Sequence, residues 1–162
     1  MFDTQPNLVC ASDDAERAYQ KILRMASVRE ISTFKAREKL LRAGFSEHAI
    51  EEAISKAQGY RYIDDERYCD ALIRSRIAAG KGLSPVLKEI ESLGIDPYQL
   101  ESYIDYLEDD AVNDLERAMA LLNRRPPASK NKRDGAFRKL VQAGYSTSVA
   151  SQAARTWATG LD

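Results

Sequence analysis

Apolar residues recur at positions i, i+3, i+4 and i+7 in three stretches of the chain, the spacing of a one-sided amphipathic helix. The stretches contain Ile50, Ala53, Ile54 and Ala57; Leu100, Tyr103, Ile104 and Leu107; and Ala150, Ala153, Ala154 and Trp157. Further helical patterns precede them at 14–27, 64–79 and 109–123. The hydrophobic pattern therefore predicts a chain made of helices.

A glycine marks the same corner before each of these stretches. Gly44, Gly94 and Gly144 are spaced by 50 residues, and Ser46, Asp96 and Ser146 follow them at equal distance. Glycine closes a helix in the left-handed conformation, and Ser or Asp accepts hydrogen bonds from the first turn of the next helix. Each glycine thus predicts a turn between two helices.

Together these patterns predict an all-α fold with three tandem three-helix repeats, stacked as a helical array. We expect the repeats at 13–58, 59–108 and 109–162, with a loose N-terminal tail at 1–12. A Pro- and Lys-rich loop is predicted at 124–134, inside the third repeat.

Composition limits the class of protein. The chain has 162 residues, of which 44% are hydrophobic and 30% charged, and no apolar run approaches the length of a membrane span. The start of the chain lacks a basic and then apolar leader, so a cytoplasmic protein without membrane association is expected. Neither the two cysteines nor the single His48 suggests a metal site or general base, and no cofactor is predicted.

Charge alternates in blocks along the chain although the net charge is only −1. Lys and Arg minus Asp and Glu gives −4 for 1–16, +4 for 17–59, 0 for 60–95, −8 for 96–116 and +7 for 117–162. Such blocks allow a basic surface to meet a polyanion while an acidic one meets a protein.

The acidic run Asp64, Asp65 and Glu66 has two interpretations. Clustered carboxylates bind Mg²⁺ in nucleases, which would predict Mg²⁺-dependent cleavage. Acids in the first turn of a helix also cap its N–H groups, and consecutive side chains on a helix diverge. We favour capping, and a non-enzymatic protein.

Basic residues in all three repeats could follow a phosphate backbone. The candidates are Arg24, Arg29, Lys35, Arg37, Lys39, Arg42, Arg67, Arg74, Arg76, Lys81, Lys130, Lys132, Arg133, Arg138 and Lys139. The helix pairs also suggest a helix-turn-helix reader of duplex DNA, although two of the second helices carry acids that phosphates would repel.

The segment Tyr62 to Tyr68, the tripeptide Arg74–Arg76, the Gly80-Lys81-Gly82 loop and Gly94-Ile95 resemble the RecX family of recombinase regulators. The resemblance runs from about Arg17 to Thr159. It implies an elongated, curved array of three modules that lies in the groove of a RecA filament on single-stranded DNA. It further implies inhibition of ATP hydrolysis and strand exchange, with structural roles for Tyr62, Ile63 and Tyr68.

Our leading hypothesis is a monomeric, non-catalytic RecA regulator in DNA repair and the SOS response. It predicts RecA and single-stranded DNA as partners, with weak duplex binding. One alternative is a helical scaffold that binds only protein through the acidic block 96–116. The other is a general DNA-binding helical protein.

Overall fold

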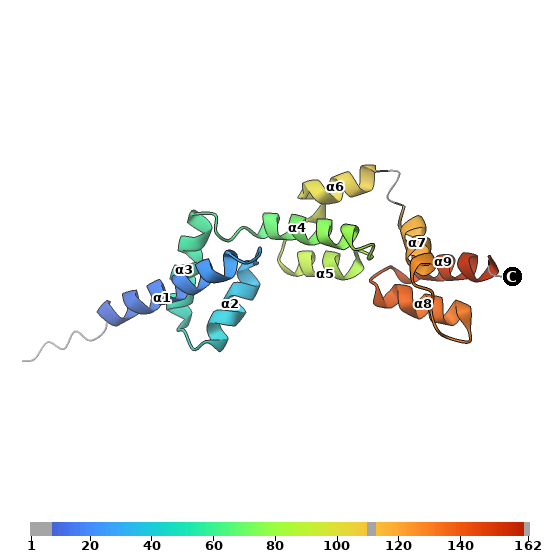
Figure 1. The fold of residues 1–162 in the computed structure, drawn as a ribbon. Coiled ribbons are helices and arrows are strands. Elements are labelled where there is room, and N and C mark those ends of the chain that lie inside the picture. Colours follow the sequence, from blue (N-terminus) through green and yellow to red (C-terminus); the bar gives the residue numbers. More distant parts are fainter. Residues whose placement is uncertain (1–7, 110–112, 161–162) are drawn as a thin grey trace, which may run out of the picture. The chain divides into compact units, whose positions relative to one another are not determined.

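The chain forms nine α-helices and a 3-10 turn in the residues that the computed structural model describes, 8–109 and 113–160, with side chains from residue 13 onward (Figure 1). These elements are α1 (Leu8–Ala26), α2 (Thr33–Arg42), α3 (Glu47–Gly59), α4 (Asp65–Ala78), α5 (Ser84–Ser92), η1 (Pro97–Gln99), α6 (Glu101–Glu108), α7 (Asp114–Arg124), α8 (Lys132–Gln142) and α9 (Thr147–Thr159). No strand occurs in these described ranges, so the predicted all-α class is confirmed.

Contacts between the helices divide the chain into two compact units, residues 1–68 and 69–162, and the division falls inside α4. In unit 1, α1 and α2 both pack against α3. In unit 2, α7 and α8 pack against α9 in the same way, whereas α5 and α6 contact η1. The number and boundaries of the repeats stay a prediction.

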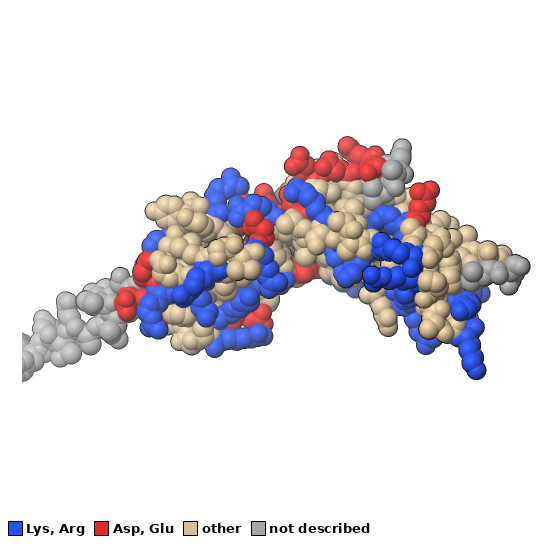
Figure 2. All heavy atoms as spheres, viewed as in Figure 1, with Lys and Arg blue, Asp and Glu red and all other residues tan. Residues whose placement is uncertain are grey.

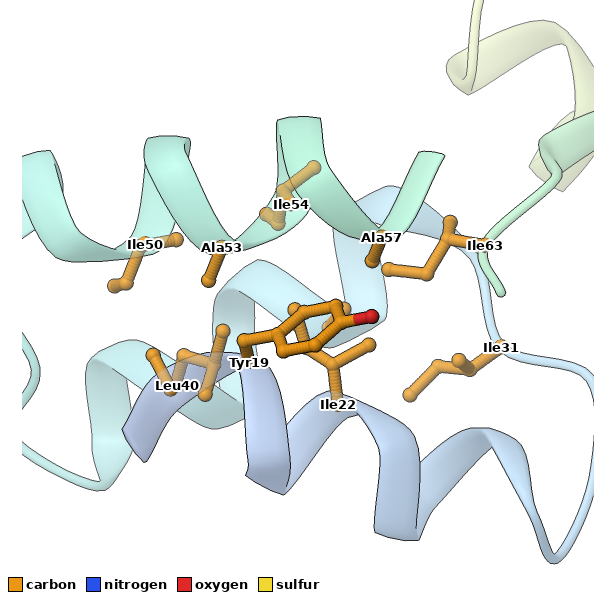
Figure 3. Close-up of a cluster of buried hydrophobic side chains, with 11 residues drawn as sticks. Tyr19, Ile22, Ile31, Leu40, Ile50, Ala53, Ile54, Ala57 and Ile63 are labelled. Carbon is orange, nitrogen blue, oxygen red and sulfur yellow. The ribbon is translucent and has the colours of Figure 1, made fainter. Parts of the chain in front are cut away.

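Unit 1 has its core between α1, α2 and α3. Figure 3 shows the stripe of α3, from Ile50 to Ala57, facing Tyr19 and Ile22 of α1. Leu40 of α2 completes the cluster and is fully buried. The stripe predicted for this helix is confirmed.

Unit 2 uses the equivalent stripe of α9. Ala150, Ala153 and Ala154 are buried in one cluster with residues of α7 and α8. Trp157 is buried beside them, and its indole N–H donates to the side-chain oxygen of Asn123 at 2.9 Å. Because the alanines are small, α7 and α8 can approach α9 closely.

The stripe predicted for the second repeat is wrong at two positions. Ile104 and Leu107 of α6 are 38% and 51% exposed, and it is Ser102 that faces inward. The 3-10 turn delays the start of α6 until Glu101, after which the Ser102 N–H donates to the Asp70 carboxylate at 3.0 Å. This anchor turns the apolar side of α6 outward.

Three predicted boundaries also differ. Helix α1 starts at Leu8, inside the predicted tail, since no Gly or Pro interrupts the segment after it; residues 1–7 lie outside the described residues. Helix α7 starts at Asp114 with Asn113 as its cap, because Asp109 still donates its N–H to Asp105 and ends α6; Asp110 is not described. Helix α8 starts at Lys132, inside the predicted loop, since the Asn131 side chain caps it.

The glycine corners have the predicted chemistry. Gly44, Gly94 and Gly144 adopt φ values of 87°, 75° and 93°, the left-handed region that favours glycine. At Gly144 the following N–H, of Tyr145, reaches back to Leu140 O at 3.1 Å, which satisfies a carbonyl of the last turn of α8. Ser146 then accepts from the Val149 N–H at 3.2 Å and opens α9.

The loop 80–84 lies directly against the Gly144 corner within unit 2. The Gly82 N–H donates to Ala143 O at 3.1 Å, and the Ser84 N–H donates to Gly144 O at 3.2 Å. The Tyr145 hydroxyl donates to Gly80 O at 2.7 Å. A side chain at Gly82 would place its Cβ 2.2 Å from Gly144 O, so only glycine fits here.

We expect Gly82→Ala to destabilise unit 2 by about 2 kcal/mol or more, because two backbones would have to separate. Trp157 is the only tryptophan of the chain, so its fluorescence during urea unfolding reports on unit 2. Gly160→Ala is the matched control, since its Cβ would meet atoms at an ordinary 3.6 Å. Equal stability of the two variants would contradict this account of the junction.

Candidate functional site

An open basic pocket of about 670 Å³ lies on unit 1. It is lined by Lys21, Arg24, Met25, Val28, Arg29, Ile31, Lys39 and Arg42. Lys21 and Arg24 come from one face of α1, and Lys39 and Arg42 from one face of α2, since residues three apart on a helix are neighbours. Figure 2 shows that Lys and Arg also gather on the visible face of this unit. We call this hollow the basic pocket.

The charges of the basic pocket are largely available to a ligand. Arg24, Arg29 and Lys39 form no ion pair within the residues that the structure describes, and Arg42 pairs with Glu38 at 2.6 Å while staying 75% exposed. Four predicted contact residues therefore converge in one place. Lys21 was missed, although its spacing of three from Arg24 was a usable signal.

Lys35 and Arg37 lie on α2, as Lys39 and Arg42 do, but they do not line the basic pocket. Arg37 forms an ion pair with Glu51 of α3, and this hydrogen bond raises the pKa of the guanidinium above its usual value. The Lys35 ammonium donates to the Tyr68 hydroxyl and lies 5.0 Å from the centre of the ring. Both side chains thus hold elements of unit 1 together.

The acidic run caps helices. Asp64 accepts from the Arg67 N–H at 3.0 Å and from the Arg61 guanidinium at 2.7 Å, and these bonds hold its pKa below the usual value. Asp65 accepts from the N–H of Thr33, the first residue of α2, at 2.6 Å. In the described ranges, no three His, Cys, Asp or Glu residues are grouped to hold a metal ion.

The apolar and aromatic residues of the segment Tyr62 to Tyr68 differ in burial. Ile63 and Tyr68 are buried, whereas Tyr62 is 46% exposed, and the structural role of all three stays a prediction. Tyr62 instead packs edge-on against Tyr19, with 6.4 Å between the ring centres.

Arg67 connects three segments of unit 1. Its Nε donates to Glu30 at 2.8 Å, and its Nη2 donates to the backbone oxygen of Arg61 at 3.1 Å. The pKa of the guanidinium is raised, first of all by the hydrogen bond to Glu30. Arg67 therefore links segments of unit 1 while its side chain stays 40% exposed, and its role as a contact residue stays a prediction.

Arg76 closes the junction in unit 2. Its Nη2 donates to Gly82 O and Ala143 O, both at 3.0 Å, so one guanidinium ties the loop 80–84 to the end of α8. It also lies against Gly144, where a Cβ would be 2.3 Å from Nη2 and would displace the guanidinium from these bonds. Arg76, a predicted contact residue, thus has a structural task.

Arg117 supports this junction from α7 and was missed by the sequence analysis. It donates to the backbone oxygen of Lys81 at 2.7 Å and to Asp114 at 3.1 Å. The Asp114 carboxylate accepts from the Tyr106 hydroxyl, and burial together with this bond raises the pKa of that phenol. No sequence signal distinguished Arg117 from the surface arginines.

The remaining predicted contact residues of unit 2 are not gathered as in the basic pocket. Arg74 is 62% exposed and lies 4.0 Å from Asp70, and the Lys81 side chain is exposed. On α8, Lys132 and Lys139 are seven apart and share a face, whereas Arg133 and Arg138 project elsewhere. Lys130 precedes this helix on an exposed loop.

Acidic side chains gather along α6. Glu101, Asp105 and Glu108 lie at spacings of four and three, so they form one exposed line, which Figure 2 shows in red over this helix. Within the described ranges, none of the helices is both long and apolar enough to span a bilayer.

Sequence comparisons find relatives that cover most of the chain. The regulatory protein RecX of Syntrophotalea carbinolica is 29% identical over 148 residues, which are 83% of this chain and 92% of that protein. The protein of the same name from Bacillus licheniformis is 29% identical over 87% of this chain. That of Haemophilus influenzae strain PittEE is 33% identical over 56% of this chain. The chain is thus similar to RecX proteins along most of its length.

The share of a relative's length that this chain covers differs between the relatives. The chain spans 55% of the Bacillus protein and 64% of the Haemophilus protein. No protein-family model matches the chain. The relatives are named as regulatory proteins, in agreement with the prediction of a non-enzymatic role.

Solved RecX structures share the fold. The crystal structure of RecX from Lactobacillus salivarius superposes with a TM-score of 0.64 at 22% identity, and covers 91% of this chain and 99% of its own. A second crystal structure of regulatory protein RecX gives a TM-score of 0.63 at 20% identity. The two RecX-like motifs Arg74–Arg76 and Gly80–Gly82 supply the junction just described.

We expect Arg76→Met to destabilise unit 2 by about 1–3 kcal/mol, because Gly82 O loses its charged donor and Ala143 O keeps only the Gly82 N–H. Arg74→Met should change stability by less than about 0.5 kcal/mol, since an exposed ion pair contributes little. Urea unfolding followed by Trp157 fluorescence compares the two variants. A larger loss for Arg74→Met would show that the assignment is reversed.

Asp64 should make folding sensitive to acid. Because its pKa is lowered by folding, it contributes stability above about pH 4, which is lost as the pH falls through the folded-state pKa. The difference in melting temperature between pH 7 and pH 3 should therefore be smaller for Asp64→Asn than for the wild type. Asp105→Asn, an exposed acid on α6, serves as control and should leave the difference unchanged.

Proposed function

We propose that this chain is a RecX-type, non-catalytic regulator of RecA recombinase that acts without a cofactor and as a monomer. It binds in the groove of the RecA filament on single-stranded DNA and inhibits ATP hydrolysis, strand exchange and filament growth. Its place is the cytoplasm, in DNA repair and the SOS response. The RecX relatives and the motif from Tyr62 to Gly82 support this proposal.

The basic pocket of unit 1 is the observation that carries the DNA side of the proposal. Five cations line it together with the apolar residues Met25, Val28 and Ile31. Each phosphate neutralised on a single strand lowers the slope of log affinity against log salt by about 0.7, so full engagement predicts a slope of roughly −3 to −4.

Hydrogen bonds within the units make some of the predicted basic residues weaker candidates for contact with DNA. Arg37, Arg67 and Arg76 already hold their own units together, so DNA would have to compete with those bonds. The pocket residues, together with exposed Arg74, Lys81 and the basic side chains around α8, remain the candidates for filament contact.

The deciding assay measures single-stranded-DNA-dependent ATP hydrolysis by RecA. We expect the wild type to lower the rate, and the double reversal Arg29→Glu and Lys39→Glu to raise the concentration for half-inhibition at least about tenfold. Lys88→Glu with Arg155→Glu changes the net charge equally at exposed sites outside the basic pocket and should inhibit almost as the wild type does.

Other outcomes separate the alternatives. If the wild type leaves ATP hydrolysis unchanged at equimolar or higher ratios, the proposal fails. Binding without any dependence on salt would favour the protein-only scaffold, and a preference for one duplex sequence in a selection experiment would favour the duplex reader.

A further inference from the structure

Helix α6 exposes an apolar edge beside its acidic line. Ile104 and Leu107 follow one another along this edge, next to the line of Glu101, Asp105 and Glu108. The opposite side of the helix is held inside unit 2, where Ser102 binds Asp70 and Tyr106 binds Asp114. The exposed side is therefore fixed in orientation, although none of the described residues of unit 2 covers it. We call it the α6 face.

The apolar edge continues into a hollow beside the helix. Tyr103 packs edge-on against Tyr98 with 5.4 Å between ring centres, and Tyr98 is 66% exposed. Both tyrosines line an open hollow of about 410 Å³ that also includes Leu87 and Ile95. An exposed apolar patch with a rim of charge is typical of a protein-binding surface.

The charge of the α6 face decides what kind of partner it can bind. No Lys or Arg occurs in residues 96–116, so phosphates would be repelled along its whole length. A partner must offer positive charge to the acidic line and apolar side chains to Ile104, Leu107 and the tyrosine hollow. These demands are met together by a basic amphipathic protein segment.

We propose that the α6 face binds a positively charged, amphipathic segment of a protein partner. Identifying that partner as RecA in the filament rests on the function proposed above, whereas the chemistry of the segment rests on the α6 face alone. The chain then has two separate contacts, the basic pocket for phosphate and the α6 face for protein.

The test uses two variants of the full chain and two binding partners. Glu101→Gln with Asp105→Asn and Glu108→Gln removes the acidic line, and Leu107→Ser weakens the apolar edge. Binding is measured by co-sedimentation with RecA filaments on oligo(dT), and by fluorescence anisotropy with a labelled helical peptide of leucine and lysine. A peptide with glutamate in place of lysine is the charge control.

Both variants should bind the filament and the basic peptide about tenfold or more weakly, and bind protein-free single-stranded DNA at least as well as the wild type does. Glu47→Gln with Glu52→Gln and Glu116→Gln removes three exposed acids outside the α6 face and should bind as the wild type does. Circular dichroism checks that each variant is folded.

The remaining outcomes are distinct. If the wild type does not bind the RecA filament but binds the basic peptide through the α6 face, the proposed function fails and this inference stands. Unchanged binding of both partners by both variants overturns the inference. It is also overturned if the face self-associates, seen as a concentration-dependent sedimentation coefficient that Leu107→Ser abolishes.

Discussion

The backbone contact between the loop 80–84 and the Gly144 corner is the constraint on which unit 2 depends. A helix that ends inside a protein must find donors for its last carbonyls. Here Gly82 supplies a backbone donor to Ala143 O, and Arg76 supplies a charged one. The contact requires two glycines, because a Cβ at Gly82 would lie 2.2 Å from Gly144 O and because Gly144 adopts a φ of 93°. The loop 80–84, which the sequence presents as a charged contact loop, thus packs parts of unit 2 together.

The same demand for partners decides which cations are open to ligands. Hydrogen bonds to acids or carbonyls of their own units occupy Arg37, Arg67, Arg76 and Arg117. Around the basic pocket, in contrast, acids are scarce and the side chains project into an open hollow. The cations of the basic pocket, which make few bonds within their unit, are therefore the ones that we propose for ligand contact, with the α6 face as an acidic and apolar counterpart.

The sequence predicted local structure well because local structure follows local rules. Glycine at a corner, Ser or Asp two residues later and apolar spacing on α3 and α9 all depend on neighbours within one or two turns. The prediction was wrong on α6, where the apolar spacing was present. There the Asp70 carboxylate, 32 residues away, bonds to Ser102 and turns the helix.

Residue type and spacing by themselves determined the helices, their caps, the left-handed corners and the alternation of charge. Only the tertiary structure decided which arginines are internal, that Lys21 joins Arg24, Arg29, Lys39 and Arg42 in one pocket, and that Ile104 and Leu107 face outward. The physical reason is that the role of a charged or apolar side chain depends on the residues that it contacts in the fold. Those contacting residues belong to other helices, and the spacing of residues along one helix does not specify them.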